Sequence, residues 1–370
     1  MTLYPLLLEP AYKDYIWGGN RIPCVFRRPL PDGIYAESWE VSDRPEGLSR
    51  VTNGPLAGQS LAEVIRTFGP AIAGPAGTPT CANPGRARQS VLLHREARST
   101  LEGAAPSAPV SGSTPTRHPS SPECAPLPFP LLVKLIDARE RLSLQVHPDD
   151  ATAVICGGEA KTEAWHILEA APGAQVFAGL RPGVTEASFR EALAASRLET
   201  CLQAIPVKAG DTIFIPGGRV HAICEGCLLL EVQQNSNTTY RVYDWGRVGT
   251  DGKPRELHVA KAFQVIRWND AGEPKTVSRP LTHADGTTSV ELVASPYFRL
   301  ERLDLKGPLT CRHDGKSFHA LFTSGTAVDV EACGERVEVP FGRSCLIPAG
   351  IREYRLLPHG QGAVLCTSVP

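Results

Sequence analysis

Four side chains that are far apart in the sequence have the types needed to hold one metal ion. Gln145 and His147 stand two apart in the segment SLQVHPDD, so an extended strand points both side chains to one face. Glu163 begins a later apolar segment, and His221 follows a glycine turn. The four residues offer two imidazole nitrogens and two side-chain oxygens, which suit Zn, Mn, Co or Fe and leave room for water or substrate. Taken singly, each histidine is more often an ordinary, partly buried residue than a ligand.

Short apolar segments rich in Val, Ile, Leu and Phe must position these residues. They alternate with Gly, Pro and Asp, which is typical of a sandwich or barrel of antiparallel strands. The segments are PLLVKLI, AWHILEA, QVFAGL, DTIFIP, CLLLEVQQ and TTYRVYDW. Two helices are expected among them, one over 185–196 with Thr185 as its cap and a short one that starts near Asp149 or Asp150. At these two aspartates a helix start is favoured over metal binding.

A weak internal repeat indicates two related β units. GDTIFIPGGRVH, from Gly210 to His221, and GRSCLIPAGIRE, from Gly342 to Glu353, share the spacing Gly, five residues, Pro, one residue, Gly. The pattern describes a strand that ends at a proline and a glycine turn that returns the chain antiparallel. Upstream, KTEAWHIL resembles KSFHALF. Because Glu353 replaces the closing histidine and Lys316 falls near the place of a glutamate ligand, the second unit is expected to bind no metal.

Length, charge and cysteine usage limit the classes to which the protein can belong. The chain has 370 residues and a formal net charge of −1 with both signs interspersed, so nucleic acid is not an expected partner. No apolar run approaches the roughly 18 residues of a membrane span, and no signal peptide is expected. The 11 cysteines follow no repeating spacing, which favours reduced thiols in the cytoplasm. The C-x-x-C pair Cys224 and Cys227 leads into an apolar run and is interpreted as core thiols.

The composition also predicts the domain boundaries. Residues 76–127 are dense in Pro, Ser, Gly and Ala, so they cannot bury enough apolar surface to fold and form a predicted disordered insertion. We expect residues 1–75 to start the metal-binding domain and residues 128–270 to complete it, with a helical segment near 182–204. Residues 271–370 then form a second, metal-free domain.

Several motifs in one order resemble those of the type I mannose-6-phosphate isomerases, a family of the cupin superfamily. They lie on both sides of the insertion and run to about residue 265. The matching stretches are YIWGG, AESWEVSD, FPLLVKLIDARERLSLQVHPDD, AKTEAWHIL with Ala160 for the family's glycine, IPGGRVHAI and LLEVQQNSNTTYRVYDWGR. The resemblance implies a mostly β protein with two cupin-type jelly-roll β-barrel domains and a small helical insertion. It also implies one zinc ion per chain, held by Gln145, His147, Glu163 and His221.

The spacing of the ligands separates this pattern from other cupins. The usual first cupin motif has His-x-His followed closely by Glu, whereas Gln145 here replaces the first histidine. Glu163 lies much farther along the chain, as in the isomerases. This pattern argues against the site of a cupin dioxygenase.

The resemblance further implies a reaction. Interconversion of mannose 6-phosphate and fructose 6-phosphate moves a proton between C2 and C1 through an enediol, whose developing negative oxygen needs a cationic site. Arg241 matches the family's catalytic arginine, a fixed cation suited to the enediolate or the phosphate. Lys161 matches the lysine two residues before the glutamate ligand and is expected to contact substrate or move a proton.

Other residues match pocket positions of the family with less defined roles. Those assigned to substrate binding are Ser143, Lys134, Trp17 and Glu37. For Trp39, core packing and substrate contact are equally favoured. His166 and His258 are assigned no catalytic role, and His166 is expected to face away from Glu163 because successive strand residues alternate.

Two other functions stay open at this point. One is a different metal-dependent cupin enzyme, and the other is a catalytically inactive sugar-binding or regulatory cupin. The sequence has no G-x-G-x-x-G after a strand, no Walker loop and no G-x-S-x-G elbow, so dinucleotide, nucleotide and serine-hydrolase functions lack their motifs. A phosphorylated hexose is the expected partner, and the oligomeric state is left open.

Overall fold

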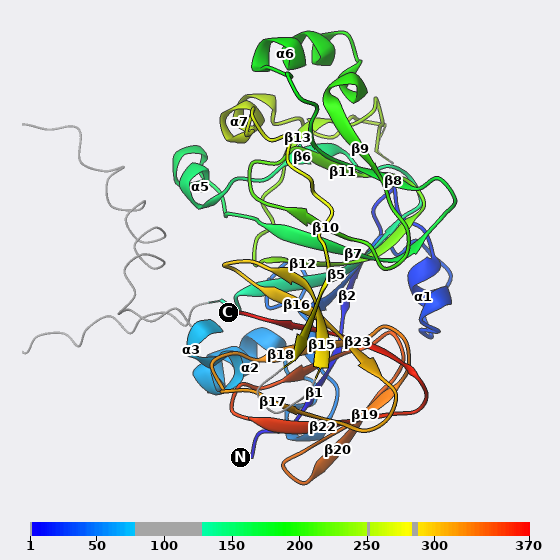
Figure 1. The fold of residues 1–370 in the computed structure, drawn as a ribbon, viewed down its shortest axis with the longest axis vertical. Helices are drawn as coiled ribbons and strands as arrows, with labels where there is room; N and C mark the ends of the chain where they lie inside the picture. Colours follow the sequence, from blue (N-terminus) through cyan, green and yellow to red (C-terminus); the bar gives the residue numbers. More distant parts are fainter. Residues whose placement is uncertain (1, 78–127, 250–251, 283–287) are drawn as a thin grey trace, which may run out of the picture. The chain divides into compact units, whose positions relative to one another are not determined.

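The chain is mostly β, as the sequence predicts, and Figure 1 shows its fold as a computed structural model. The structure describes residues 2–77, 128–249, 252–282 and 288–370. The predicted disordered insertion at 76–127 lies almost entirely outside the described residues. None of the helices within the described ranges combines the length and the apolar character needed to cross a membrane.

Two antiparallel sheets form what we call the first sheet pair. The six-stranded sheet has, in the order of hydrogen bonding, β10 (Thr212–Ile215), β7 (Glu163–Ala170), β12 (Cys227–Gln234), β5 (Leu131–Ala138), β3 (Glu37–Val41) and β2 (Ala11–Lys13). The five-stranded sheet has β13 (Tyr240–Tyr243), β6 (Leu144–Val146), β11 (His221–Ile223), β8 (Gln175–Leu180) and β9 (Leu202–Pro206).

Two further sheets form the second sheet pair. The eight-stranded sheet has β14 (Arg279–Thr282), β15 (Thr288–Ala294), β16 (Arg299–Leu305), β23 (Gly362–Ser368), β18 (His319–Thr323), β21 (Ser344–Ile347), β1 (Leu6–Glu9) and β4 (Arg50–Val51). The four-stranded sheet has β17 (Leu309–Arg312), β22 (Glu353–Pro358), β19 (Val328–Ala332) and β20 (Glu335–Val339). The N-terminal strand therefore completes a sheet built mainly from the C-terminal part of the chain.

The two sheet pairs repeat one strand order. The order β10-β7-β12-β5-β3-β2 corresponds to β21-β18-β23-β16-β15-β14, and β6-β11-β8-β9 corresponds to β17-β22-β19-β20. In both copies the Gly-Pro-Gly pattern lies at the same place, because β10 ends just before Pro216 and β21 just before Pro348. The internal repeat is thus confirmed. None of the four sheets that the described residues form closes on itself into a barrel.

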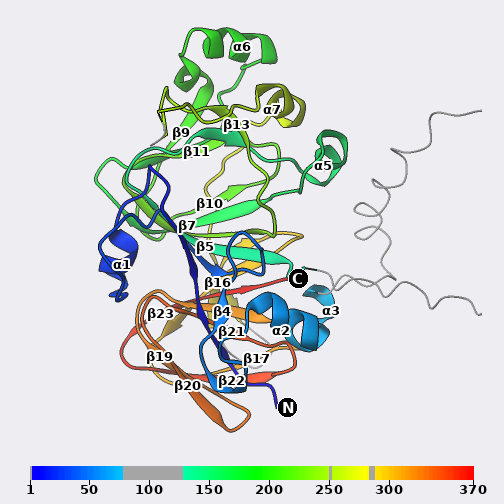
Figure 2. The same ribbon diagram turned by 180° about the vertical axis from the view of Figure 1, so that it is seen from behind.

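Alternation along β5 separates two hydrophobic cores. Leu131 and Val133 pack in one core with residues of the second sheet pair such as Phe318, whereas Ile136 belongs to a core between the two sheets of the first pair. Successive strand residues point to opposite faces, so Lys134 lies on the same face as Ile136. Both ribbon views agree that β5 lies between β11 on one side and β23 on the other (Figures 1 and 2).

Short helices connect and flank the strands. They are α1 (Arg21–Val25), η1 (Gly54–Leu56), α2 (Leu61–Phe68), α3 (Pro70–Gly77), α5 (Asp150–Cys156), α6 (Glu186–Ala194), η4 (Leu198–Cys201) and α7 (Val259–Val265). Both helices predicted from caps are confirmed. Asp149 accepts a hydrogen bond from the backbone N–H of Thr152 at the start of α5, and Thr185 accepts one from Ser188 at the start of α6.

The C-x-x-C pair is confirmed as core thiols. Cys224 and Cys227 are both free and buried. Burial raises the pKa of Cys224 to about 12 and that of Cys227 to about 11, so both remain protonated and unreactive at neutral pH.

A buried ion pair joins the two sheet pairs. Arg28 Nη1 lies 2.8 Å from Glu40 Oε1, and both side chains are fully buried. Arg28 also donates to the carbonyl of Gly342, and the hydroxyl of Ser344 donates to Glu40 Oε2 at 3.0 Å. Residues on β3 and on β21 are therefore tied through one guanidinium and one carboxylate.

We expect Glu40→Ala to lower the free energy of unfolding by about 3–5 kcal/mol, because it leaves the Arg28 cation buried without its counterion. Chemical denaturation measures this loss. The control is Glu186→Ala, which breaks the exposed pair with Arg190 on α6 and should cost less than about 1 kcal/mol. Equal losses in the two variants would contradict a stabilising role for the buried pair.

Candidate active site

Strand register brings three of the predicted site residues into one row. Gln145 on β6 pairs with His221 on one side and with Arg241 on β13 on the other. Directly opposed residues of antiparallel strands point to the same face. The five-stranded sheet therefore presents a glutamine, a histidine and an arginine side by side, toward the six-stranded sheet that carries Glu163.

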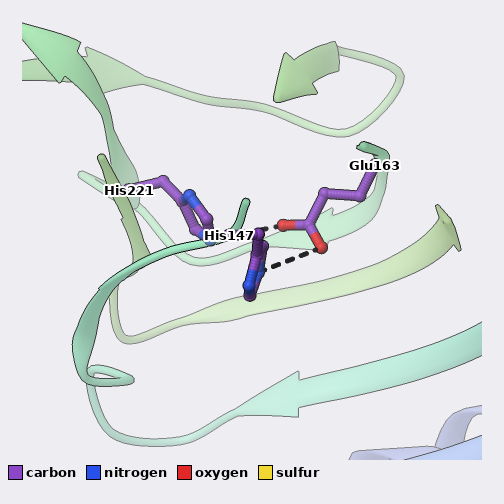
Figure 3. Close-up of side chains that lie close together, drawn as sticks. All are labelled: His147, Glu163 and His221. Carbon is purple, nitrogen blue, oxygen red and sulfur yellow. Dashed lines mark ion pairs between the residues drawn. The ribbon is translucent and has the colours of Figure 1, made fainter. Parts of the chain in front are cut away.

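His147, Glu163 and His221 form a group able to hold a metal ion (Figure 3). One ligand atom from each lies within 4.8 Å of the others, and all three residues are buried. Glu163 points between the two imidazoles. Its Oε2 lies 3.6 Å from His147 Nε2 and its Oε1 lies 3.4 Å from His221 Nε2. Three of the four predicted ligands thus converge although the first and the last are 74 positions apart in the sequence.

Backbone carbonyls orient the two imidazoles. His147 Nδ1 lies 2.9 Å from the carbonyl oxygen of Thr238, and His221 Nδ1 lies 2.8 Å from that of Arg219. Each Nδ1 therefore carries a proton, which leaves the lone pair of each Nε2 directed at Glu163. Burial lowers the pKa of His221 to about 3 and that of His147 well below its usual value, so both rings are neutral, as metal ligands must be.

The carboxylate of Glu163 has the environment of an anion that needs a cation. It is fully buried, and neither oxygen accepts a hydrogen bond of normal geometry from the described residues. Burial, followed by repulsion from Glu231, raises its pKa to about 7. The Lys161 ammonium lies 2.6 Å from Glu163 Oε2 and 3.2 Å from His147 Nε2, so this pocket already accommodates positive charge. Although Lys161 is paired with Oε2, the buried donor set of two neutral imidazoles and one carboxylate fits a divalent metal ion.

Gln145 lies beside this group in one particular orientation. Its amide nitrogen is 3.3 Å from His221 Nε2, and its amide oxygen accepts a hydrogen bond from Ser143 Oγ at 3.4 Å. Coordination through the oxygen therefore requires the amide to turn over, an exchange of two nearly isosteric groups. Gln145 contacts His221, and its role as a fourth ligand stays a prediction.

A polar cavity of about 300 Å³ is linked to the three-residue group by two of its lining residues, Gln145 beside His221 and Lys161 beside Glu163. It is lined by all four residues predicted to bind substrate, by both residues predicted to be catalytic and by one predicted metal ligand, namely Trp17, Glu37, Lys134, Ser143, Lys161, Arg241 and Gln145. Its lining also includes polar residues that the sequence analysis did not select: Tyr15, Glu231, Asn237, Thr239 and Arg255. Trp39 does not line it.

A network of charges covers the wall of the cavity formed by the six-stranded sheet. Lys134 Nζ lies 3.4 Å from Glu231 Oε1 and 3.6 Å from Glu37 Oε2. Although burial disfavours the charged forms, these carboxylates raise the pKa of Lys134, while Lys161 and Lys134 hold the pKa of Glu231 below its usual value. The wall therefore carries fixed charges of both signs.

Two tryptophans hold these carboxylates in place. Trp39 Nε1 donates to Glu37 Oε2 at 2.6 Å, and Trp165 Nε1 donates to Glu231 Oε2 at 3.0 Å. Both rings are buried. For Trp39, the question left open by the sequence is answered in favour of packing, since it supports Glu37 from behind.

Arg241 lies on the opposite wall of the cavity. Its Nη1 donates to the carbonyl of Glu256 at 2.8 Å, and its backbone N–H donates to His258 Nδ1 at 3.2 Å. Burial and the neighbouring Arg255 lower the pKa of Arg241, although it stays a cation at any physiological pH. His258 thus positions the strand that carries Arg241, which agrees with its lack of a predicted catalytic role.

His166 faces away from the cavity, as alternation predicts. Its Nδ1 lies 2.9 Å from Thr212 Oγ1 on β10, and the ring is 5 % exposed. Burial, followed by the positive charge of Arg302, lowers the pKa of His166 to about 4. The ring is therefore a neutral, buried member of the interface between the two sheet pairs.

The burial of His166 should make the stability of the protein depend on pH. Because the folded pKa of His166 lies below its ordinary value of 6.5, its contribution to stability is present above pH 6.5 and is lost as the pH falls toward about 4. We expect His166→Gln, which retains a hydrogen-bonding group, to remove about 3 kcal/mol of the difference in unfolding free energy between pH 7 and pH 4. Parallel pH profiles for the variant and the wild type would rule this out.

The most informative residue missed in the sequence is Glu231. A glutamate between Leu230 and Val232 in the apolar strand CLLLEVQQ is the available signal, because a charged residue on a buried strand needs a partner. The partner, Lys134, is almost a hundred residues away and pairs with Glu231 only through the register of β5 and β12.

A buried nitrogen and oxygen ligand set at the end of a charged cavity between two β-sheets is typical of a metal-dependent enzyme for a small polar substrate. No family model matches the chain. The chain is 30% identical over 365 residues to the mannose-6-phosphate isomerase ManA of Bacillus subtilis, with 98% of each chain covered. It is 33% identical over 304 residues to the mannose-6-phosphate isomerase of Streptococcus mutans, covering 82% of this chain and 79% of that protein.

The solved structures agree with these relatives. The crystal structure of the mannose 6-phosphate isomerase from Bacillus subtilis superimposes with a TM-score of 0.76 and 27% sequence identity, and all of both chains is covered. The chain therefore belongs to the type I mannose-6-phosphate isomerase family, and the resemblance found in its motifs is confirmed.

Proposed function

We propose that this protein interconverts mannose 6-phosphate and fructose 6-phosphate. The observation that carries this function is the buried group of His147, Glu163 and His221 at the end of a cavity lined by Lys134, Lys161, Arg241 and Arg255. Four cationic side chains suit a doubly charged phosphate ester, and the buried group suits a metal beside its sugar. The names of the relatives support the same substrate.

The metal proposed is one zinc ion per chain. His147, Glu163 and His221 would hold it, with the amide oxygen of Gln145 as a fourth ligand after its rotation. Two neutral imidazoles and a carboxylate are a common catalytic ligand set for zinc. When bound, the ion supplies positive charge that polarises the oxygens of the sugar and favours a negatively charged enediolate.

The residues of the cavity have separate roles in this proposal. Ser143, Trp17, Glu37 and Lys134 shape the sugar site, and the Lys134 ammonium is fixed by its two carboxylates. Lys161 lies between Glu163 and Glu231, at 2.6 Å and 3.9 Å, where it can pass a proton to or from a bound sugar. Arg241 supplies a permanent cation from the opposite wall for the enediolate or the phosphate.

The same proposal extends to the domains and to the compartment. The repeated strand order supports two cupin-type jelly-roll domains, a metal-binding one that residues 128–270 complete and a metal-free one formed mainly by residues 271–370. Residues 1–75 add β2 and β3 to the first domain and β1 and β4 to the second. A cytoplasmic location fits the nine cysteines of the described ranges, all of which are free thiols.

Isomerisation in deuterated water tests the function. An enediol route exposes the moving proton to exchange, so nuclear magnetic resonance should show conversion of mannose 6-phosphate into fructose 6-phosphate with deuterium entering at C1 or C2. Stoichiometric binding of mannose 6-phosphate to the zinc-loaded protein without conversion would support an inactive sugar-binding protein and refute the enzyme.

A further inference from the structure

The second sheet pair contains a cavity of about 700 Å³. Strand register relates it to the first cavity. Glu163 on β7 pairs with Ile215, the residue before the proline of the repeat, and His319 on β18 pairs with Ile347, which precedes the proline of the second copy. His319 therefore stands where Glu163 stands in the first sheet pair. The sequence comparison had placed Lys316 near this position, three residues earlier.

The same register gives counterparts for the charged wall. Glu231 pairs with Lys134 across β12 and β5, and Cys366 pairs with Glu301 across β23 and β16. Cys366 thus corresponds to Glu231, and Glu301 to Lys134. Both line the second cavity, as His319 does.

The remaining counterparts lie on the four-stranded sheet. Gln145 pairs with His221 in the first sheet pair, and Arg312 pairs with Glu353 in the second. Arg312 lines the second cavity and takes the place of Gln145. The second cavity is therefore the repeat of the first cavity, but residues of other chemical types stand at the positions of the metal ligands. An arginine holds no metal, and here it is ion-paired at 2.8 Å with the residue that replaces the closing histidine.

Charged side chains of both signs lie at the rim of the second cavity. Arg299, Arg312 and Lys316 line it together with two acidic residues, Glu301 and Asp314. Arg299 is exposed and forms no ion pair with any residue in the described ranges. The ion pair between Lys316 and Asp314 is exposed on both sides, so an incoming anion can compete for the ammonium at little cost.

Neutral hydrogen-bonding groups lie in the interior. His319 Nδ1 is 2.8 Å from the Tyr354 hydroxyl, and the rings of His313 and His319 have centroids 4.5 Å apart. His313 Nδ1 accepts a hydrogen bond from the backbone N–H of Gly315 at 3.2 Å, so the neutral ring carries its proton on Nε2. Two imidazoles and a phenol suit hydroxyl groups of a ligand, as the cations of the rim suit an anion.

We propose that the second cavity binds a small phosphate monoester of a polyol without a metal, as a site separate from the first. Its volume falls within the usual range of small-molecule sites. Arg299 and Lys316 are placed to hold the phosphate, and the histidines and Tyr354 are placed to hold the hydroxyls. This site does not depend on the isomerase activity, because none of its residues lines the first cavity.

Isothermal titration with 1,5-anhydromannitol 6-phosphate tests the proposal, since this ester has no carbonyl carbon and cannot isomerise. We expect two binding sites per wild-type chain. In the double variant Arg299→Glu with Lys316→Glu, affinity at one site should fall at least about tenfold, while turnover of mannose 6-phosphate stays within about twofold of the wild type. The matched control is Lys306→Glu, a charge reversal at an exposed lysine of the same sheet pair that does not line the cavity.

Three outcomes would overturn the second site. They are a single binding site in the wild type that the double variant leaves unchanged, two unchanged sites in the double variant, and an equal loss of affinity in Lys306→Glu. Titration with unphosphorylated 1,5-anhydromannitol decides the ligand class, because equal affinity for it at the second site would refute a phosphate ester. Since these are binding measurements, they give the same answer whether or not the protein isomerises mannose 6-phosphate.

Discussion

Glu163→Gln is expected to lose the bound metal and to lower turnover of mannose 6-phosphate about a thousandfold or more. The substitution keeps the shape of the side chain but removes the one negative charge that lies between His147 and His221. It also removes a charge that burial disfavours, and Lys161 keeps Glu231 as a second counterion at 3.9 Å, so the folded state should survive. Metal content by mass spectrometry and a coupled isomerase assay measure the two losses.

His221→Ala is the companion variant, and it should also lose both metal and turnover. The control is His166→Gln, which changes a buried histidine on the same strand as Glu163 but on its opposite face. That variant should retain one metal per chain and nearly full turnover at pH 7. Full activity in a Glu163→Gln protein shown to be free of metal would refute the proposed site.

Arg241→Ala is expected to separate metal binding from catalysis. The guanidinium lines the cavity from β13, but it is no metal ligand, so zinc content should stay at one per chain. Loss of a fixed cation that faces developing negative charge should lower kcat/KM about a hundredfold to a thousandfold. Arg241→Lys should recover only part of this loss, because an ammonium lacks the planar fork of the guanidinium.

The matched control is Arg190→Ala, which removes an exposed arginine on α6 that takes no part in either cavity. Its kinetic constants should equal those of the wild type. If Arg241→Ala turned over mannose 6-phosphate at the wild-type rate, Arg241 would have no part in the reaction. If it also lost zinc, the arginine would act by supporting the neighbouring Gln145 instead.

Much of the site could be predicted because its residues lie in strands with local signals. Gln145 and His147 share a face through alternation, and the glycine turn before His221 returns the chain beside them. His166 was placed on the opposite face from Glu163 by the same argument, and its contact with Thr212 confirms this. Local spacing alone could not predict that Glu163 lies beside the histidines. That prediction came from the order of the family's motifs.

Partners that depend on long-range register could not be predicted. Lys134 meets Glu231 only because β5 pairs with β12, and no local pattern encodes that pairing. The N-terminal strand β1 pairs with β21, where Leu6 lies opposite Leu346, and three leucines and a glutamate carry no information about so distant a neighbour. The shift from Lys316 to His319 at the counterpart of Glu163 has the same origin, since sequence similarity over seven residues cannot fix a strand register.

The resemblance implied closed barrels, whereas the sheets of the described residues remain open. Alternating patterns predict which face of a strand is buried, but they say nothing about whether the end strands of two sheets pair with each other. Burial of β5 and β12 on both faces was predictable from their nearly continuous apolar sequences, whereas closure of the sheets was not predictable.

Zinc titration of metal-stripped protein tests most directly whether the buried group drives the reaction. Wild-type protein is dialysed against a chelator, zinc is added in steps, and conversion of mannose 6-phosphate is followed at each step. We predict that stripped protein is inactive and that activity rises linearly to a plateau at one zinc per chain. Undiminished activity in protein shown to contain no metal would contradict the proposed function of His147, Glu163 and His221.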